Sequence, residues 1–213
     1  MDNAVALVRT YLHVNGYFTV CEYPVLEAAR RSYRTVTDLD VLAVRFPGAG
    51  RFVGGSIDAR RDVDSRFEPD AVLGVAGSAP DMLIGEIKEG RPRLNEAATD
   101  VLTLQAAMVR FGCCSADEAA SLADDVVRQG STRSPHGHRI RLVIFASTGD
   151  ATMRDGIRVV PLGHVVHFLE EYLEENWDVL RHAQFKDPAF GFLMTLAKAR
   201  RAGGPSGHAG RTP

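Results

Sequence analysis

Two segments of the sequence place charged residues inside otherwise apolar runs. The first, residues 37–44, reads Thr-Asp-Leu-Asp-Val-Leu-Ala-Val and carries Asp40 near its centre. The second, residues 83–88, reads Leu-Ile-Gly-Glu-Ile-Lys and ends with Glu86 and Lys88. β-Strands disfavour Asp, and a buried charge needs a partner or a metal ion. Because side chains alternate along a strand, we expect Glu86 and Lys88 on the same face, about 7 Å apart.

Such a group of side chains suits the hydrolysis of a phosphodiester bond. Carboxylates can hold Mg²⁺ or Mn²⁺, which prefer oxygen ligands. A bound metal ion stabilises the charge that develops on the phosphate and lowers the pKa of a bound water. A lysine beside it can orient the attacking water or balance the charge of the transition state. The sequence therefore predicts a metal-dependent phosphodiesterase site built from Asp40, Glu86 and Lys88.

The elements that must position these residues follow from the periodicity of the sequence. Apolar residues at helical spacing predict a first helix at 4–12, and β-branched and aromatic residues predict strands at 17–26 and 35–46. The same criteria predict the later elements, which are a short strand at 71–75, a strand at 81–88, a helix at 94–111, a short helix at 118–128, strands at 140–146 and 156–161, and helices at 165–180 and 189–200.

The predicted order is α-β-β-β-α-β, followed by a strand and two helices. This order favours an α/β fold with a mixed central sheet flanked by helices. We expect a single domain over residues 1–201, with excursions from the core at 47–80 and 115–137. Residues 202–213 are small, polar and rich in Gly and Pro, which predicts a disordered tail.

Asp40 and the later Glu86-x-Lys88, in this order of elements, resemble the PD-(D/E)xK nuclease superfamily. The run Asp-Leu-Asp-Val-Leu-Ala at 38–43 is especially similar to the first motif of the RecB-like and Holliday-junction-resolvase-like branches. The resemblance covers about residues 1–146. It implies a restriction-endonuclease-like core with extra C-terminal helices, Mg²⁺ or Mn²⁺ as cofactor, nucleic acid as partner with DNA preferred, and a homodimer.

The same resemblance implies a role for each motif residue. Asp40 and Glu86 would be metal ligands, and Ile87 would contribute its backbone carbonyl. Lys88 would be the catalytic lysine. Gln105 lies on the following helix, where several branches carry a glutamine near the site, and its spacing predicts that it faces inward among apolar neighbours.

The sequence departs from the family pattern in two places. The first predicted helix has no glutamate where many resolvase-like members carry one, and Glu22 and Glu27 on the next strand are the candidates for that role. The segment between the two motifs is long for a hairpin. A rival register uses Asp70, and Asp81 is a third candidate, although it points to the opposite face of its strand. We favour Asp40 because its flanking residues alternate as a strand.

Basic residues flank both motif strands and can form a phosphate-binding groove beside the site. Arginine suits this role because its planar guanidinium pairs with two phosphate oxygens at once. The net charge of the chain is −2, so affinity for nucleic acid must come from one patch and must fall steeply with salt. The residues are Arg30, Arg31, Arg34, Arg91 and Arg93.

The composition excludes several classes of protein. With 45% hydrophobic and 24% charged residues, the chain resembles an ordinary globular protein. No apolar run approaches the ~20 residues of a membrane span, and the first residues lack the features of a signal peptide. Three cysteines are too few for a disulfide framework. We therefore expect a cytoplasmic protein with reduced thiols and no membrane association.

Two other hypotheses fit the same residues. In the first, the chain is a catalytically inactive binding or scaffold module on a nuclease-like fold. In the second, it is an unrelated α/β domain whose charges form surface ion pairs. Surface pairs contribute only ~0–1 kcal/mol and need no common site. In the unrelated domain, Asp40 and Glu86 would point apart, whereas in a nuclease-like fold they converge.

Overall fold

The computed structural model describes residues 2–53, 63–75 and 77–202. Its centre is a mixed sheet with the strand order β1-β2-β5-β7-β9-β8, in which β6 also pairs with β7. The strands of this seven-stranded sheet are β1 (Phe18–Ala29), β2 (Ser32–Arg45), β5 (Asp81–Lys88), β6 (Ser131–Arg133), β7 (Arg139–Ala146), β8 (Thr152–Arg154) and β9 (Ile157–Pro161). A separate two-stranded sheet pairs β3 (Gly50–Val53) with β4 (Val63–Arg66).

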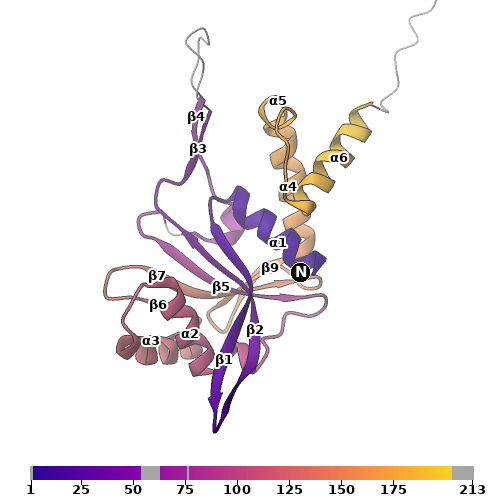
Figure 1. The fold of residues 1–213 in the computed structure, drawn as a ribbon. Coiled ribbons are helices and arrows are strands. Elements are labelled where there is room, and N and C mark those ends of the chain that lie inside the picture. Colours follow the sequence, from indigo (N-terminus) through magenta and orange to yellow (C-terminus); the bar gives the residue numbers. More distant parts are fainter. Residues whose placement is uncertain (1, 54–62, 76, 203–213) are drawn as a thin grey trace, which may run out of the picture.

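Helices cover both faces of the sheet, so the fold is α/β with a helix layer on each side (Figure 1). The helices are α1 (Asn3–Val14), α2 (Val101–Phe111), α3 (Ala116–Gln129), α4 (Leu162–Glu175), α5 (Trp177–Leu180) and α6 (Pro188–Ala202), with short 3₁₀ turns η1 (Ala71–Leu73) and η2 (Ala97–Thr99). One apolar core lies between the sheet and α1, α4 and α6, and the other lies between the sheet and α2 and α3.

Strand direction decides which residues share an edge of the sheet. β2 runs antiparallel to both of its neighbours, β1 and β5, whereas β5, β7 and β9 are parallel. Helices α2 and α3 make the connection from β5 to β7, as a parallel pair requires. The carboxyl ends of β5, β7 and β9 therefore lie at one edge of the sheet, and Lys88 ends β5 at that edge.

Local signals explain where several elements begin and end. Ser115 begins α3 through a reciprocal capping box with Glu118. Gly130 follows α3 with φ 72°, and an added Cβ would lie 2.5 Å from the carbonyl oxygen of Gly156. Only glycine fits this close approach between the end of α3 and the β8–β9 turn. No helix in the described part of the chain has the length and apolarity required to cross a membrane.

Most of the elements expected from the sequence are confirmed, and β5 has the expected bounds of 81–88. The single helix expected at 165–180 is a correction, because the structure divides it at Asn176 into α4 and α5. Residues 71–75 are a correction: η1 replaces the expected strand, because the side chain of Asp70 binds the N–H of Val72 and starts a turn. The helix expected from residue 94 begins only at Val101, since the Asp100 carboxylate binds the N–H groups of Leu102 and Thr103. Strands β3, β4, β6 and β8 were not expected. Residues 203–213, most of the predicted tail, lie outside the described residues.

Candidate active site at the carboxyl end of strand β5

The candidate site lies where β2 and β5 stop pairing. The last paired residues are Val41 and Gly85, which makes Asp40 and Glu86 the next residues on either strand. There the Asp40 carboxylate replaces the missing backbone partner, because its Oδ2 accepts a hydrogen bond from the N–H of Ile87 at 2.7 Å. Gly85 permits the close approach, since an added Cβ would lie 2.5 Å from Cγ1 of Val41.

Glu86 and Lys88 form the second half of the site. The Lys88 ammonium binds Oε1 of Glu86, as their shared face of the strand predicts. The Glu86 side chain is 7% exposed, whereas that of Lys88 is 34% exposed. The carboxylate is therefore held inside the protein, and the ammonium group reaches toward solvent.

The two carboxylates influence each other electrostatically. Burial raises the pKa of Glu86, Lys88 opposes this increase, and the negative charge of Asp40 adds to it. Burial also raises the pKa of Asp40, although the Ile87 N–H and Lys88 act in the opposite direction. Both carboxylates thus carry an incompletely compensated charge, which is the condition under which a cation binds most favourably.

Four further acidic residues line a depression around Asp40 and Lys88, and one of them, Glu22, was anticipated; the four are Asp2, Glu22, Asp38 and Glu89. Glu22 lines it together with Asp40 and Lys88, so of the two candidates for the missing helix glutamate it is the one placed at the site. Its φ is 53°, a left-handed conformation that is rare outside glycine, and it is skipped in the β1–β2 pairing directly opposite Asp40. Glu27 instead binds Arg34, away from the site.

Asp2 was missed by the sequence analysis. It lines the depression with Ala4 and Val5 at the start of α1, and its Oδ1 accepts the N–H of Ala4 at 2.9 Å. An acidic residue immediately before an apolar helix is a typical N-cap, which is the signal that could have identified it. The amino end of α1, with its partial positive charge, therefore points toward the candidate site.

The residues available as metal ligands are few. Among residues 2–53, 63–75 and 77–202, no group of three or more His, Cys, Asp and Glu side chains is arranged to hold a metal ion. The donors that converge are the carboxylates of Asp40 and Glu86, with the main chain of Ile87 between them and Lys88. Two hard oxygen donors that retain room for water match the preference of Mg²⁺, which keeps several waters when it binds to proteins.

Gln105 does not lie in the depression around Asp40. It is half-buried and contributes to a different groove, which Tyr23, Leu102 and Val109 also form. The expectation that it faces inward among apolar residues is thus met only in part. The turn of α2 that carries it packs toward β1 rather than toward the carboxyl end of β5.

The five basic residues proposed for phosphate binding divide into two groups. Arg91 and Arg93 are exposed in the segment directly after β5, close in sequence to Lys88. Arg30 and Arg31 form the turn between β1 and β2, and Arg34 follows near the start of β2. At about 3.3 Å per residue, Arg34 is about 20 Å from Asp40 along the strand. The expected groove of all five beside the site is therefore a correction: three of them lie at the tip of a hairpin.

The rival Asp70 belongs to the opposite end of the molecule. Its Oδ2 accepts the hydroxyl of Tyr11 at 2.6 Å and lies 2.5 Å from Nε2 of His164 on α4. Its Oδ1 accepts the N–H of Val72 at 2.9 Å. Tyr11 lies near the carboxyl end of α1, about 13 Å along that helix from the amino end that faces Asp40. Asp70 is thus occupied in joining α1, η1 and α4.

The third candidate, Asp81, is enclosed in an ion pair. Its two carboxylate oxygens accept hydrogen bonds from Nε and Nη2 of Arg141, and Oδ2 accepts the hydroxyl of Tyr17 at 2.5 Å. Burial lowers the pKa of Arg141, but the hydrogen bonds and charge of Asp81 outweigh it and raise that pKa above its ordinary value. Asp70, Asp81 and the residues that bind them form a group of polar side chains near the amino end of β5. The group consists of Tyr11, Tyr17, Asp70, Asp81, Arg141 and His164.

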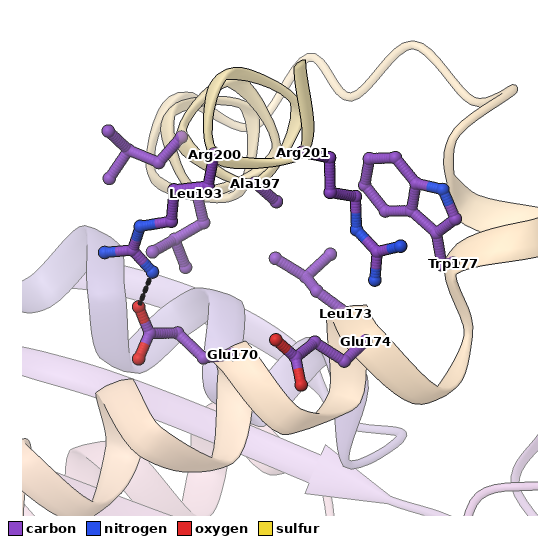
Figure 2. Close-up of a pocket in the computed structure, with 9 residues that line it drawn as sticks. Glu170, Leu173, Glu174, Trp177, Leu193, Ala197, Arg200 and Arg201 are labelled. Atoms are coloured by element: carbon purple, nitrogen blue, oxygen red, sulfur yellow. Dashed lines mark hydrogen bonds and ion pairs between the residues drawn. The ribbon is translucent and has the colours of Figure 1, made fainter. Parts of the chain in front are cut away.

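A further groove runs between α4, α5 and α6, and Figure 2 shows its lining. Nη1 of Arg200 binds Oε1 of Glu170 at 2.8 Å, and the guanidinium of Arg201 lies 4.2 Å from the centre of the Trp177 ring. Leu173 and Leu193 line the floor between them. Arg200 and Glu170 pair across the seam between α6 and α4, and Arg201 stacks on Trp177, which are packing roles.

Comparison of the chain with protein-family models, with curated proteins and with solved structures finds no match. The arrangement of residues in the structure is thus the basis for a functional interpretation.

Proposed function

We propose that this protein is a Mg²⁺-dependent nuclease that hydrolyses phosphodiester bonds in DNA, with an active site of the PD-(D/E)xK type. The single observation that carries the proposal is the convergence of Asp40, Glu86 and Lys88 where β2 separates from β5. Glu86 binds Lys88 directly, and Asp40 on the neighbouring strand lies close enough for its negative charge to raise the pKa of Glu86.

The order of the elements supports the same proposal. Along the chain, α1, β1, β2, β5, α2 and β7 give α-β-β-β-α-β, with the two-stranded β3–β4 sheet inserted between β2 and β5, and α3 and β6 inserted between α2 and β7. Neighbouring strands in space are β1, β2, β5 and β7. The site lies beyond the carboxyl end of a parallel strand, which is the edge where ligands commonly bind in α/β proteins.

Each residue then has a defined task. The carboxylates of Asp40 and Glu86, with the backbone of Ile87, would hold Mg²⁺, which supplies charge stabilisation at the phosphate and activates water when bound. Lys88 contributes a positive charge that orients the attacking water or offsets the negative charge of the transition state. Without a cation, the same ammonium group neutralises Glu86, which explains why a buried glutamate is tolerated there.

The proposal is tested by cleavage of labelled DNA in Mg²⁺ or Mn²⁺ by the wild type and by Asp40→Asn, Glu86→Gln and Lys88→Ala. We expect each substitution to lower the cleavage rate by at least about 100-fold, as loss of a group that stabilises the transition state does. Glu171→Gln and Lys198→Ala remove the same charges at exposed helix positions and serve as matched controls. Titration calorimetry with Mn²⁺ should detect binding to the wild type that Glu86→Gln weakens.

A catalytically inactive binding or scaffold module is the second candidate function. The observation that favours it is the direct ion pair between Lys88 and Glu86, which gives the buried carboxylate a counter-charge without a metal ion. This alternative predicts that no cation tested promotes cleavage. Cleavage that survives Glu86→Gln unchanged would contradict the nuclease assignment.

A further inference from the structure

The β1–β2 hairpin extends far beyond the body of the protein. Val25 and Leu39 are the last residues of its two strands that are buried in the core. Among residues 26–38, every side chain whose burial is described is exposed or only half-buried. From Leu39 to the turn, the hairpin is about 26 Å long. Figure 1 shows this hairpin arm, residues 26–38, projecting away from the helices that cover the sheet.

The hairpin arm begins at the candidate active site. β2 pairs with β5 only as far as Val41, and from there β2 continues with β1 as its partner. Asp40 is the residue at which β2 leaves the body of the sheet. A ligand at the carboxyl end of β5 that extends in the direction of β2 therefore runs alongside the arm.

The charge of the arm differs from that of the whole chain. The chain carries 25 basic and 27 acidic residues, whereas the arm contains Arg30, Arg31 and Arg34 against two acids, Glu27 and, at its base, Asp38. Glu27 binds Arg34 through Oε2 at 2.6 Å, which holds that guanidinium on one face of the hairpin. The tip of the arm is thus a local positive surface on an acidic protein.

The residue preferences of hairpin turns do not explain why two arginines occupy the turn of this arm. Hairpins with two-residue turns prefer Gly, Asn or Asp, because the favoured turn types need a positive φ. Arg30 and Arg31 are the turn residues, and neither has a positive φ. Residues that ignore the local rule without a packing benefit are commonly retained for function.

Large apolar side chains on the arm are also left uncovered. Leu26 is 63% exposed and Tyr33 is 78% exposed. Leu26 pairs with Thr35 and Tyr33 pairs with Ala28, so both lie on the same face of the hairpin. A two-stranded hairpin is only marginally stable in water, which makes exposed apolar groups on it costly unless a partner covers them.

The strands of the arm are also turned relative to the sheet. The pairing shifts by one residue between Val25 and Leu26, and Val36 is the residue left without a partner. Such a bulge bends the strand and increases its twist. Leu26 and Tyr33 therefore lie on a face of the hairpin that is rotated relative to the part of the sheet that packs on the core.

We propose that the hairpin arm binds double-stranded DNA, with the ribbon in the major groove and the tip arginines on phosphate oxygens. The location of the substrate rests on the proposed nuclease function, but the binding itself does not. The major groove of B-DNA is about 12 Å wide and accepts a two-stranded ribbon. The arm spans about 26 Å, or about eight base pairs, between its tip and the site. Double-stranded RNA is disfavoured because its deep, narrow major groove excludes such a ribbon.

The test measures binding of the full chain to a fluorescein-labelled 20-base-pair DNA duplex by anisotropy, in EDTA and again in Ca²⁺, over a series of salt concentrations. The variant Arg30→Ala/Arg31→Ala removes two exposed charges at the tip. Arg128→Ala/Arg133→Ala removes two exposed charges at the end of α3 and in β6, and is the matched control. Matching far-UV circular dichroism and melting temperatures exclude a folding defect.

We expect the tip variant to bind the duplex at least about tenfold more weakly at low salt, with the slope of log K against log salt reduced by about 2. The control should change affinity by less than about twofold. Equal losses in the two double variants, no duplex binding by the wild type in either buffer, or equal binding of double-stranded RNA or single-stranded DNA would each overturn the proposal.

The outcomes for the arm and for the active site are separable. Metal-dependent cleavage that needs Glu86, together with unchanged binding by the tip variant, refutes the arm and leaves the nuclease. Arm-dependent binding of duplex DNA without cleavage in any metal refutes the nuclease and leaves the arm.

Discussion

Both ends of strand β5 are rich in charged residues, but the acids at the two ends differ in how completely protein groups bind them. At the amino end, Asp81 is enclosed by Arg141 and Tyr17, and Asp70 is bound by Tyr11, Val72 and His164. At the carboxyl end, Glu86 binds the ammonium of Lys88 and the backbone of Asn95, and Asp40 accepts one hydrogen bond from the N–H of Ile87. Acids whose oxygens are all occupied by fixed protein donors hold the fold together, whereas incompletely compensated acids are available to a ligand.

The pKa shifts agree with this contrast. At the carboxyl end, burial raises the pKa of both Glu86 and Asp40. At the amino end, the shifts fall on the partners of the acids: burial and the nearby carboxylates raise the pKa of Tyr11 and of Tyr17, which keeps both hydroxyls protonated as donors. The acids at the amino end of β5 stabilise the fold, whereas those at the carboxyl end carry an electrostatic cost to stability, as functional sites commonly do.

The largest expected effect on stability is at Arg141. Arg141→Met removes the cation that hydrogen-bonds to buried Asp81 and leaves only Arg139, whose Nη1 lies 3.7 Å from Oδ1 of Asp81; breaking a buried pair from one side costs about 3–5 kcal/mol. We expect the free energy of unfolding, measured in urea, to fall by this amount. The double variant Asp81→Leu/Arg141→Met removes both charges and should recover at least half of the loss. If the free energy of unfolding of Arg141→Met fell by less than about 1 kcal/mol, the proposed difference between the two ends of β5 would be contradicted.

A smaller effect is expected at Tyr11. Tyr11→Phe removes one of the donors to the Asp70 carboxylate while keeping the ring in the core, where it packs edge-on against Phe145 and Phe168. Loss of a hydrogen bond to a charged group costs about 1.5–3 kcal/mol. The matched control is Tyr33→Phe on the exposed arm, which should change the free energy of unfolding by less than about 0.5 kcal/mol. Equal effects of the two substitutions would refute the structural role of Asp70.

The smallest effect, and one of opposite sign, is expected at Glu86. Because burial raises the folded-state pKa of Glu86, the ionised carboxylate destabilises the fold at neutral pH, and Glu86→Gln should raise the melting temperature slightly while it lowers the cleavage rate at least about 100-fold. As pH falls through the folded-state pKa, the wild type becomes protonated and the advantage of Glu86→Gln should disappear. Thermal melts between pH 7 and pH 4 measure this difference.

Asp187 supplies the control for that pH dependence. Burial raises its pKa, but hydrogen bonds from Phe190, Thr10 and Arg9 outweigh burial, and the net pKa is lowered. It therefore stabilises the fold above its unfolded-state pKa, and this contribution is lost as pH falls through the folded-state pKa. Asp187→Asn should be destabilising at pH 7 and nearly neutral near pH 3. A common pH profile for Glu86→Gln and Asp187→Asn would contradict the assignment of opposite electrostatic roles.

Much of the framework could be predicted because its signals are local. The alternating and apolar patterns of β5 and β7, and the helical spacing in α3, identify these elements without reference to the rest of the chain. The incorrect element predictions arise where a side chain competes for backbone hydrogen bonds. Asp70 and Asp100 divert the backbone into turns through their own side chains, which converts an expected strand into η1 and delays the start of α2. The short strands β6 and β8 gain their strand character only from pairing with a longer neighbour.

The candidate site was predictable only in part. Asp40, Glu86 and Lys88 could be selected because charges in apolar strands are unusual. The placement of Glu22 could not, because it depends on a left-handed residue in β1 opposite Asp40. The interpretation of Arg30, Arg31 and Arg34 as the rim of the site was wrong because sequence distance does not reveal that the hairpin projects outward.

The sequence by itself determined which residues are able to do chemistry and the long strands and helices that carry them. Charge type, apolar periodicity and capping residues are properties of short segments, so they can be read without knowledge of contacts. The tertiary structure alone decided which of three aspartates lies beside Glu86, which acids are occupied by buried partners, and that the arginines stand on an arm. These outcomes depend on strand register and on burial, which arise from contacts between segments far apart in the chain.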